Sequence, residues 1–408
     1  MRIVSAAAMI VMAAPVAVHA QVPAVARLRT DLNRAVAAGE IPGATVVVMR
    51  GGKVLADVTT GWADIAKKRP LRRDAIFRLY SMSKPITSVA VMMLAEQGRL
   101  RLDDPVSKYL PELADVRVYV SGGVDDMVTR PVRRPMTIED LLTHRSGITY
   151  HFAGTTPVHL YYRKYGVMRD TPVGRMPGDG PPARSLDELV ARLGKAPLLH
   201  QPGETFAYSY STTVLGAVVQ RVSGERLDRY LRRTIFAPLG MKDTGFHISD
   251  RQLPRFTTLY GPGMVVVERP EASDYRDATR LLDGGGAIAG TADDYLRFAR
   301  MLANGGTLNG RRLLDAQSVD AMFVPRTPMA GMGPQAMQFG YGFSIGDASS
   351  DASGVQPAGT ASWSGSGNTY FFVDRRRKAV ALLMTHVLGS SGTVRASVNR
   401  AAVELIGK

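Results

Sequence analysis

Residues 76–94 read Ile76-Phe77-Arg78-Leu79-Tyr80-Ser81-Met82-Ser83-Lys84-Pro85-Ile86-Thr87-Ser88-Val89-Ala90-Val91-Met92-Met93-Leu94. In the second half of this stretch, apolar residues at positions 86, 89, 90, 93 and 94 recur at the spacing of one helical face. Gly98 is placed to end that helix. Because Pro85 has no N–H to give to the carbonyl of Ser81, the regular hydrogen-bond ladder cannot extend far before it. The sequence therefore predicts a mostly apolar helix whose opening turn is Ser81 to Lys84.

This opening turn pairs a hydroxyl with an amine. Residues three apart in a helical turn lie on one face, so the Ser81 hydroxyl and the Lys84 amine can meet. A serine hydroxyl becomes a strong nucleophile only when a neighbouring base takes its proton, and local geometry places Lys84 for that task. The free N–H groups at the helix start can stabilise an oxyanion. Ser-x-x-Lys also occurs by chance in chains of this length, so the motif needs support from elsewhere.

The composition is that of a large globular protein. The chain has 408 residues, of which 45% are hydrophobic and 21% charged, and this leaves room for a large core and two subdomains. It contains no cysteine, which excludes disulfides, thiolate metal sites and a cysteine nucleophile. Its seven histidines form no His-Glu-x-x-His motif or similar set. We therefore expect no metal and no cofactor.

The N-terminus has the pattern of a secretory signal peptide. Arg2 precedes an apolar run that ends in Val18-His19-Ala20 before Gln21. A retained membrane anchor is the alternative, but the run is short for a span of about 20 residues. We predict a signal peptide over residues 1–20, cleavage after Ala20 and no membrane span in the mature chain. A cysteine-free exported chain suits a bacterial periplasm or secreted fluid.

The chain is strongly basic, with a net charge of +15 and a pI near 10.1. Such a charge can attract anionic membranes or polymers, but the basic residues are dispersed along the sequence. The densest run, Arg375-Arg376-Arg377-Lys378, lies between two strand-like segments and is predicted to be a solvated hairpin turn. No motif supports nucleic acid binding.

Strand signals gather near the two ends of the chain. Residues 45–50 and 53–59 form a predicted hairpin, and residues 340–345, 369–373 and 380–385 are three further predicted strands before a last helix, 394–406. Between residues 100 and 254 the strand signal nearly disappears, and residues 116–135 are predicted to be a surface loop. We expect an α/β (α+β) fold with one sheet built from both ends (about 21–80 and 255–408) and a mostly helical insertion (about 81–254).

Other residues are candidates for the same cleft. Tyr208 precedes a predicted helix, and its phenol is either a core side chain with a paired hydroxyl or a proton-transfer group opposite Lys84. His386 ends a predicted strand near the cleft and is a candidate substrate contact. His144 follows a short helix and is expected to fix a turn. Residues 284–290 are glycine-rich without a phosphate-loop pattern, so they are expected to permit close packing beneath the site. The loop 155–184 is expected to shape a pocket.

Three ordered motifs give the chain a recognisable pattern: Ser81-Met82-Ser83-Lys84, Tyr208-Ser209-Tyr210 and Trp363-Ser364-Gly365. They resemble the motifs of serine β-lactamase-related hydrolases and, within these, most closely the family VIII carboxylesterases, relatives of class C β-lactamases. The similarity covers most of the mature chain, and residues 141–147, 202–204 and 284–286 agree with it. The resemblance implies a fold like that of β-lactamases and penicillin-binding proteins, with helices flanking an antiparallel sheet.

The resemblance also implies a role for each motif. Ser81 would be the acylated nucleophile, and Lys84 and Tyr208 the proton-transfer pair. The strand Trp363-Ser364-Gly365 would flank the cleft. The backbone N–H groups of Ser81 and Ser366 would form the oxyanion hole. After acylation, water would hydrolyse the ester, with Tyr208 as the preferred base.

Two departures from the family pattern bear on the substrate. β-Lactamases and penicillin-binding proteins usually carry Lys-Thr-Gly where this chain has Trp363-Ser364-Gly365. They usually carry Asn where this chain has Tyr210, so Tyr210 is a candidate substrate contact. These losses favour neutral acyl esters. The leading hypothesis is an exported serine carboxylesterase acting on a small ester. The alternatives are a β-lactamase or D-alanyl carboxypeptidase/D-aminopeptidase, and a non-catalytic protein that binds peptidoglycan or a partner. The sequence does not indicate an oligomeric state.

Overall fold

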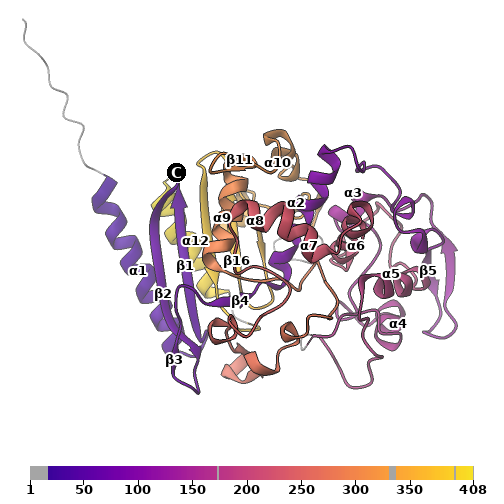
Figure 1. The fold of residues 1–408 in the computed structure, drawn as a ribbon, viewed down its shortest axis with the longest axis horizontal. Coiled ribbons are helices and arrows are strands. Elements are labelled where there is room, and N and C mark those ends of the chain that lie inside the picture. Colours follow the sequence, from indigo (N-terminus) through magenta and orange to yellow (C-terminus); the bar gives the residue numbers. More distant parts are fainter. Residues whose placement is uncertain (1–16, 172–173, 330–336, 390–391, 408) are drawn as a thin grey trace, which may run out of the picture.

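The two ends of the chain form one antiparallel sheet. The computed structural model describes residues 17–171, 174–329, 337–389 and 392–407, and its nine-stranded sheet has the order β12-β13-β14-β15-β16-β17-β1-β2-β3 (Figure 1). Near the N-terminus lie β1 (Gly43–Arg50), β2 (Lys53–Asp64) and β3 (Arg69–Pro70). The other strands are β12 (Thr327–Pro328), β13 (Gln338–Phe339), β14 (Ser344–Ile345), β15 (Ala361–Ser364), β16 (Tyr370–Asp374) and β17 (Ala379–Met384). The pairing of β1 with β17 joins the ends and confirms the predicted architecture.

Side chains on the two faces of the sheet enter different cores. Val46 and Val48 of β1 pack with α1 (Ala17–Ala37) and α12 (Thr393–Ile406). Val47 and Met49 join the larger core, which also contains α2 (Ser83–Glu96) and α9 (Ala292–Ala303). This alternation follows from the two-residue period of a strand. Figure 1 shows α1 along one side of the sheet and the helices of the inserted part at the far end of the molecule.

The regular elements between α2 and residue 254 are mainly helices. These helices are α3 (Ile138–Leu142), α4 (Pro157–Lys164), α5 (Leu186–Lys195), α6 (Ser211–Ser223) and α7 (Leu227–Leu231), followed by a π-helical turn (Arg232–Phe236) and α8 (Ala237–Leu239). Buried side chains of α3, α5 and α6 belong to the same core as α2, so the apolar interior is continuous. The predicted division at residues 80 and 255 stays a prediction.

The prediction of a surface loop over residues 116–135 is wrong. Residues 116–135 contain the hairpin of β5 (Arg117–Ser121) and β6 (Val128–Pro131). Val120 and Val128 are about half exposed, so this hairpin lacks the buried face whose alternation identifies a strand in a sequence. The remaining short elements are β7 (Leu259–Tyr260), β8 (Val266–Glu268), β10 (Thr307–Leu308), β11 (Arg311–Arg312), α10 (Ala316–Met322) and α11 (Ala348–Ala352).

The structure tests the prediction for the basic run near the C-terminus but not the prediction of a signal peptide. The predicted signal peptide lies mostly outside the described residues, and its last four positions are the beginning of α1. Within the described part of the chain, no helix is long and apolar enough to cross a membrane. The basic run Arg375 to Lys378 is the turn between β16 and β17, as predicted. Within it, Arg375 pairs with Asp320 and Arg377 with Asp374.

A buried ion pair anchors the strand that leads into the Ser81 turn. That strand, β4 (Ile76–Arg78), pairs with β9 (Ala289–Thr291). The Arg78 guanidinium donates to Glu268 Oε1 at 2.8 Å and to the Thr257 carbonyl at 2.7 Å, and both charged side chains are less than a tenth exposed. It also lies 4.0 Å from the centroid of the Phe256 ring. These contacts fix the backbone three residues before Ser81.

Removing one partner of this pair should destabilise the fold strongly. We expect Glu268→Ala to lower the free energy of unfolding by about 3–5 kcal/mol, because Arg78 would keep a buried charge without its counter-charge. The matched control is Glu271→Ala, which breaks the Lys67–Glu271 pair, 2.7 Å long with both side chains 54% exposed. That change should cost less than about 1 kcal/mol. Urea unfolding of the two variants measures both values, and equal losses would contradict the anchoring role of Arg78.

Candidate active site

The Ser81 hydroxyl and the Lys84 amine meet at the start of α2. Ser81 lies in a 3-10 turn (Tyr80–Met82) immediately before the helix, and Lys84 Nζ donates to Ser81 Oγ at 3.2 Å. Lys84 is fully buried, whereas Ser81 is partly exposed and lines a cavity. The predicted opening turn is therefore present, with its hydroxyl open to a ligand and its amine behind it.

The backbone around Ser81 is held in an unusual conformation. Tyr80 has a φ of 45°, which a residue with a side chain seldom adopts. The turn is fixed on both sides, because the Leu79 N–H donates to the Ile288 carbonyl at 3.0 Å and the Ile288 N–H donates to Ser83 Oγ at 3.2 Å. Such conformations persist only where the surrounding contacts impose them, and they concentrate at functional sites.

The Lys84 amine is held by a carbonyl and two aromatic faces. Its Nζ donates to the Gly285 carbonyl at 2.7 Å and lies 4.6 Å from the ring centroid of Tyr208 and 5.5 Å from that of Tyr150. No carboxylate within the described residues forms an ion pair with it. The amine is therefore oriented without an anionic partner.

The glycine-rich segment permits this close approach, as the sequence predicted. A Cβ atom on Gly284 would lie 2.8 Å from Thr87 Oγ1 of α2, closer than real side chains come. Behind it, Asp283 accepts hydrogen bonds from the Gly285 N–H at 2.7 Å and Thr213 Oγ1 at 2.6 Å, and pairs with Arg169 at 3.2 Å. The sequence analysis missed Asp283 and Arg169, because nothing in their local sequence indicates a pair.

Tyr208 lies at the same cavity as Ser81. Its ring packs against Lys84, against His144 with centroids 4.9 Å apart and against Trp363 at 5.5 Å. Its hydroxyl donates to no group in the described part of the chain. Of the two roles that the sequence left open, the structure favours a phenol that faces the cavity over one paired inside the core.

The strand opposite the helix start presents the third motif. Trp363, Ser364, Gly365 and Ser366 line the cavity at the end of β15. A Cβ on Gly365 would lie 2.2 Å from the Leu79 carbonyl oxygen, so only glycine lets this strand approach the Ser81 turn. Within the described residues, neither the Ser81 N–H nor the Ser366 N–H has a hydrogen-bond acceptor. Two free amides beside one hydroxyl suit an oxyanion hole.

The rest of the cavity was not predicted. Its volume is about 330 Å³, and its wall also includes the apolar side chains Met329, Met337 and Val355 and the polar side chains Gln356 and Arg395. No described residue of the predicted loop 155–184 lines it; this segment contains the helix α4, and its residues 181–184 line a different cavity of about 540 Å³. The segment folds back on itself, since the Arg163–Asp179 ion pair and a hydrogen bond from the Ala183 N–H to the Met168 carbonyl close it.

Two candidate substrate contacts are corrected by the structure. Tyr210 is 2% exposed, and its hydroxyl lies 2.7 Å from His151 Nδ1, because the chain turns into α6 at the next residue and carries the ring inward. His386 is also 2% exposed, and its Nε2 lies 3.1 Å from the Trp62 carbonyl oxygen. Burial lowers the pKa of His386 to about 3. Neither residue lines the cavity.

His144 supports Tyr208 without reaching the cavity. Its Nδ1 lies 3.0 Å from Ser209 Oγ, its carbonyl accepts from the Ala207 N–H at 2.8 Å, and its φ of 54° marks a tight turn, as predicted. Burial, and secondly the charge of Lys84, lower the pKa of His144 well below its ordinary value, so the imidazole is neutral. No group of three or more potential metal ligands occurs among the residues that the structure describes.

Comparison with known proteins agrees with this geometry. The chain matches the Beta-lactamase family over residues 28–404. Protein Rv1367c of Mycobacterium tuberculosis is 37% identical over 294 residues, covering 71% of this chain and 69% of that protein. Esterase EstB of Burkholderia gladioli is 33% identical over 397 residues, covering 90% and 92%.

A solved structure extends the likeness to the fold. It is that of EstCE1, described as a hydrolase with promiscuous acyltransferase activity, and it matches with a TM-score of 0.78 and 27% identity, covering 94% of this chain and 99% of that one. The fold that the three motifs implied is therefore confirmed. The chain belongs to the Beta-lactamase family and is related within it to family VIII esterases such as EstB and EstCE1.

Proposed function

We propose that this chain is a serine carboxylesterase that hydrolyses small esters through an acyl-enzyme on Ser81. The observation that carries the proposal is the contact of 3.2 Å between the Ser81 hydroxyl, which opens to a cavity, and the buried amine of Lys84. The ring centroid of Tyr208 lies 4.6 Å from that amine, and Tyr208 lines the same cavity as Ser81. The related proteins EstB, named an esterase, and EstCE1, described as a hydrolase, support the same reaction.

Acylation uses the hydroxyl, the amine and the two free amides. Ser81 Oγ attacks the ester carbonyl carbon, and its proton passes to the pair formed by Lys84 and Tyr208. The carbonyl oxygen becomes an oxyanion, which accepts hydrogen bonds from the N–H groups of Ser81 and Ser366. Collapse of this intermediate breaks the bond to the alcohol oxygen, and the alcohol leaves with the proton. The acyl group then remains on Ser81.

In deacylation, water attacks the acyl-enzyme in place of Ser81 Oγ. Tyr208 takes a proton from a water molecule that attacks the acyl carbon, and the second oxyanion forms in the same hole. Its collapse releases the acid and returns a proton to Ser81 Oγ, so the products are one acid and one alcohol. An alcohol in place of water would give acyl transfer, the side reaction described for EstCE1.

The cavity wall favours neutral substrates. Trp363 stands where the resemblance places a lysine that holds a substrate carboxylate, and Met329, Met337 and Val355 add apolar surface. Among the described residues of that lining, Arg395 is the one basic side chain. We therefore rank esters above β-lactams and D-amino-acid peptides. We also propose that the protein is periplasmic or secreted, from residues 1–20; a mature protein whose mass still includes Met1 to Ala20 would contradict this.

Replacing the nucleophile tests the proposal directly. We expect Ser81→Ala to lower kcat/KM for p-nitrophenyl butyrate by at least about 1000-fold, because no acyl-enzyme can form. The matched control is Ser107→Ala, a serine outside the cavity, which should retain wild-type rates. Labelling of Ser81 by a fluorophosphonate probe, read by mass spectrometry, distinguishes an enzyme from a silent binding protein. A folded protein with unlabelled Ser81 would favour the latter.

The same assay ranks the two enzymatic alternatives. Wild-type protein should hydrolyse p-nitrophenyl butyrate with a higher kcat/KM than a chromogenic cephalosporin. A strong preference for the cephalosporin would overturn the assignment as an esterase while leaving Ser81 as the nucleophile.

The Tyr208 hydroxyl should act in proton transfer rather than in binding. We expect Tyr208→Phe to lower kcat by about 100- to 10,000-fold with little change in KM, because the ring that packs on Lys84, His144 and Trp363 is kept. If Tyr208 is the base for deacylation, mass spectrometry of the variant during turnover should show Ser81 in its acylated form. Tyr161→Phe, which removes a phenol on α4, is the control. An unchanged kcat in Tyr208→Phe would contradict the assigned role.

A further inference from the structure

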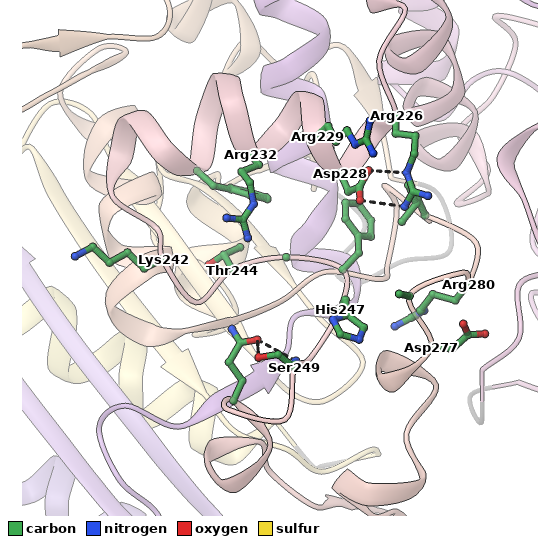
Figure 2. Close-up of a pocket in the computed structure, with 16 residues that line it drawn as sticks. Arg226, Asp228, Arg229, Arg232, Lys242, Thr244, His247, Ser249, Asp277 and Arg280 are labelled. Atoms are coloured by element: carbon green, nitrogen blue, oxygen red, sulfur yellow. Dashed lines mark hydrogen bonds and ion pairs between the residues drawn. The ribbon is translucent and has the colours of Figure 1, made fainter.

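A second cavity, remote from Ser81, is lined mainly by polar and basic side chains. Its volume is about 400 Å³, and its walls come from residues 226–236, 242–252 and 277–282. It shares no lining residue with the Ser81 cavity. Figure 2 shows Arg232 and Lys242 along one side and Arg226 and Arg280 along the other. The cavity therefore lies between cations from different segments of the chain.

The charges that line this cavity do not balance. Five basic side chains contribute to it, whereas only two carboxylates do, Asp228 and Asp277. The basic side chains are Arg226, Arg229, Arg232, Lys242 and Arg280. Asp228 already accepts two hydrogen bonds from Arg226 at 3.1 and 3.0 Å. An excess of positive charge thus surrounds a cavity large enough for a small ligand.

Three of these cations have no counter-charge in the described part of the chain. Arg229, Arg232 and Lys242 form no ion pair there, although most other arginines near them do, such as Arg233 with Glu225. Arg229 and Arg232 are three residues apart along α7 and the π-helical turn, so they lie on one side of this helical segment, and Arg226 immediately precedes it. Two unpaired guanidiniums and the Lys242 amine can together hold more than one anionic group.

Arg280 supplies an independent observation. Its side chain is only 7% exposed, its Nη2 pairs with Asp274 at 2.9 Å and its guanidinium lies 3.9 Å from the ring centroid of Tyr275. Its Nη1 is buried and has no hydrogen-bond acceptor. Figure 2 shows Arg280 and His247 facing each other across the cavity. Arg280 therefore fixes a buried positive charge in the wall of the cavity.

We propose that this cavity binds a ligand bearing a diphosphate group. Guanidiniums bind both carboxylates and phosphates in bidentate pairs, but a terminal phosphate has three oxygens, which can accept from cations on opposite walls at once. Linked phosphates also match cations that come from separate segments of the cavity wall. A neighbouring cavity of about 540 Å³ shares Asp277 and Arg280 with this one and offers space for the rest of such a ligand. The site goes beyond the proposed esterase and does not depend on it.

Titration with inorganic pyrophosphate tests this site. Isothermal titration calorimetry of the purified protein at low ionic strength should show one pyrophosphate bound per chain, more tightly than orthophosphate. The triple variant Arg229→Gln/Arg232→Gln/Lys242→Gln should bind at least about tenfold more weakly, since each charged hydrogen bond contributes more than 1 kcal/mol. Its substitutions are on exposed, unpaired side chains, so the fold should be kept.

A matched triple variant separates a site from general attraction. Lys53→Gln/Arg130→Gln/Arg311→Gln removes the same charge from exposed residues outside this cavity and should bind pyrophosphate like wild type. Arg280→Lys keeps the charge beside Asp274 but loses one donor, so it should also weaken binding, with an unchanged melting temperature. An absence of pyrophosphate binding, equal losses in the two triple variants, or citrate binding as tightly as pyrophosphate would overturn the proposal.

Discussion

The buried amine of Lys84 is the constraint on which the site depends. It is fully removed from solvent and has a carbonyl, a hydroxyl and two aromatic faces as neighbours, with no carboxylate paired to it among the described residues. Burying such a group costs free energy, so its neighbours must be held in place by other contacts. The pairing of β4 with β9 fixes the Ser81 turn, and Asp283 fixes the Gly285 backbone. The result is a preorganised site rather than an adaptable one.

The parts of this arrangement that sequence could predict are local. The spacing of Ser81 and Lys84 and the apolar face that follows place both groups on the first turn of a helix, and that turn is observed. Apolar runs near both ends predict the central strands, because those strands are buried on both faces. The sequence places Tyr208 in a short loop immediately before a helix, and the structure shows it there, at the Ser81 cavity.

The parts that could not be predicted depend on contacts between distant segments. Tyr210 is only two residues from Tyr208, yet its direction is set by the packing of α6 and by His151. His386 follows a correctly predicted strand, but the carbonyl of Trp62 holds its ring in the core. The sequence around Arg169 and around Asp283 gives no sign of their role, because the role of each depends on the ion pair that they form across the fold. The wall of the cavity near Met329 and Val355 likewise combines segments that are far apart in the sequence, so no local sequence pattern predicts that they meet.

The basic residues of this chain are unevenly distributed between its two cavities. The chain carries a net charge of +15, which attracts anions over its whole surface at low ionic strength. This charge is not concentrated at Ser81, because among the described residues the Ser81 cavity has Arg395 as its one basic lining residue whereas the second cavity has five. Of these two cavities, the one remote from Ser81 therefore attracts anions more strongly. Under the proposed function, a neutral ester would meet little competition from anions at Ser81, which is consistent with uncharged substrates in a strongly basic protein.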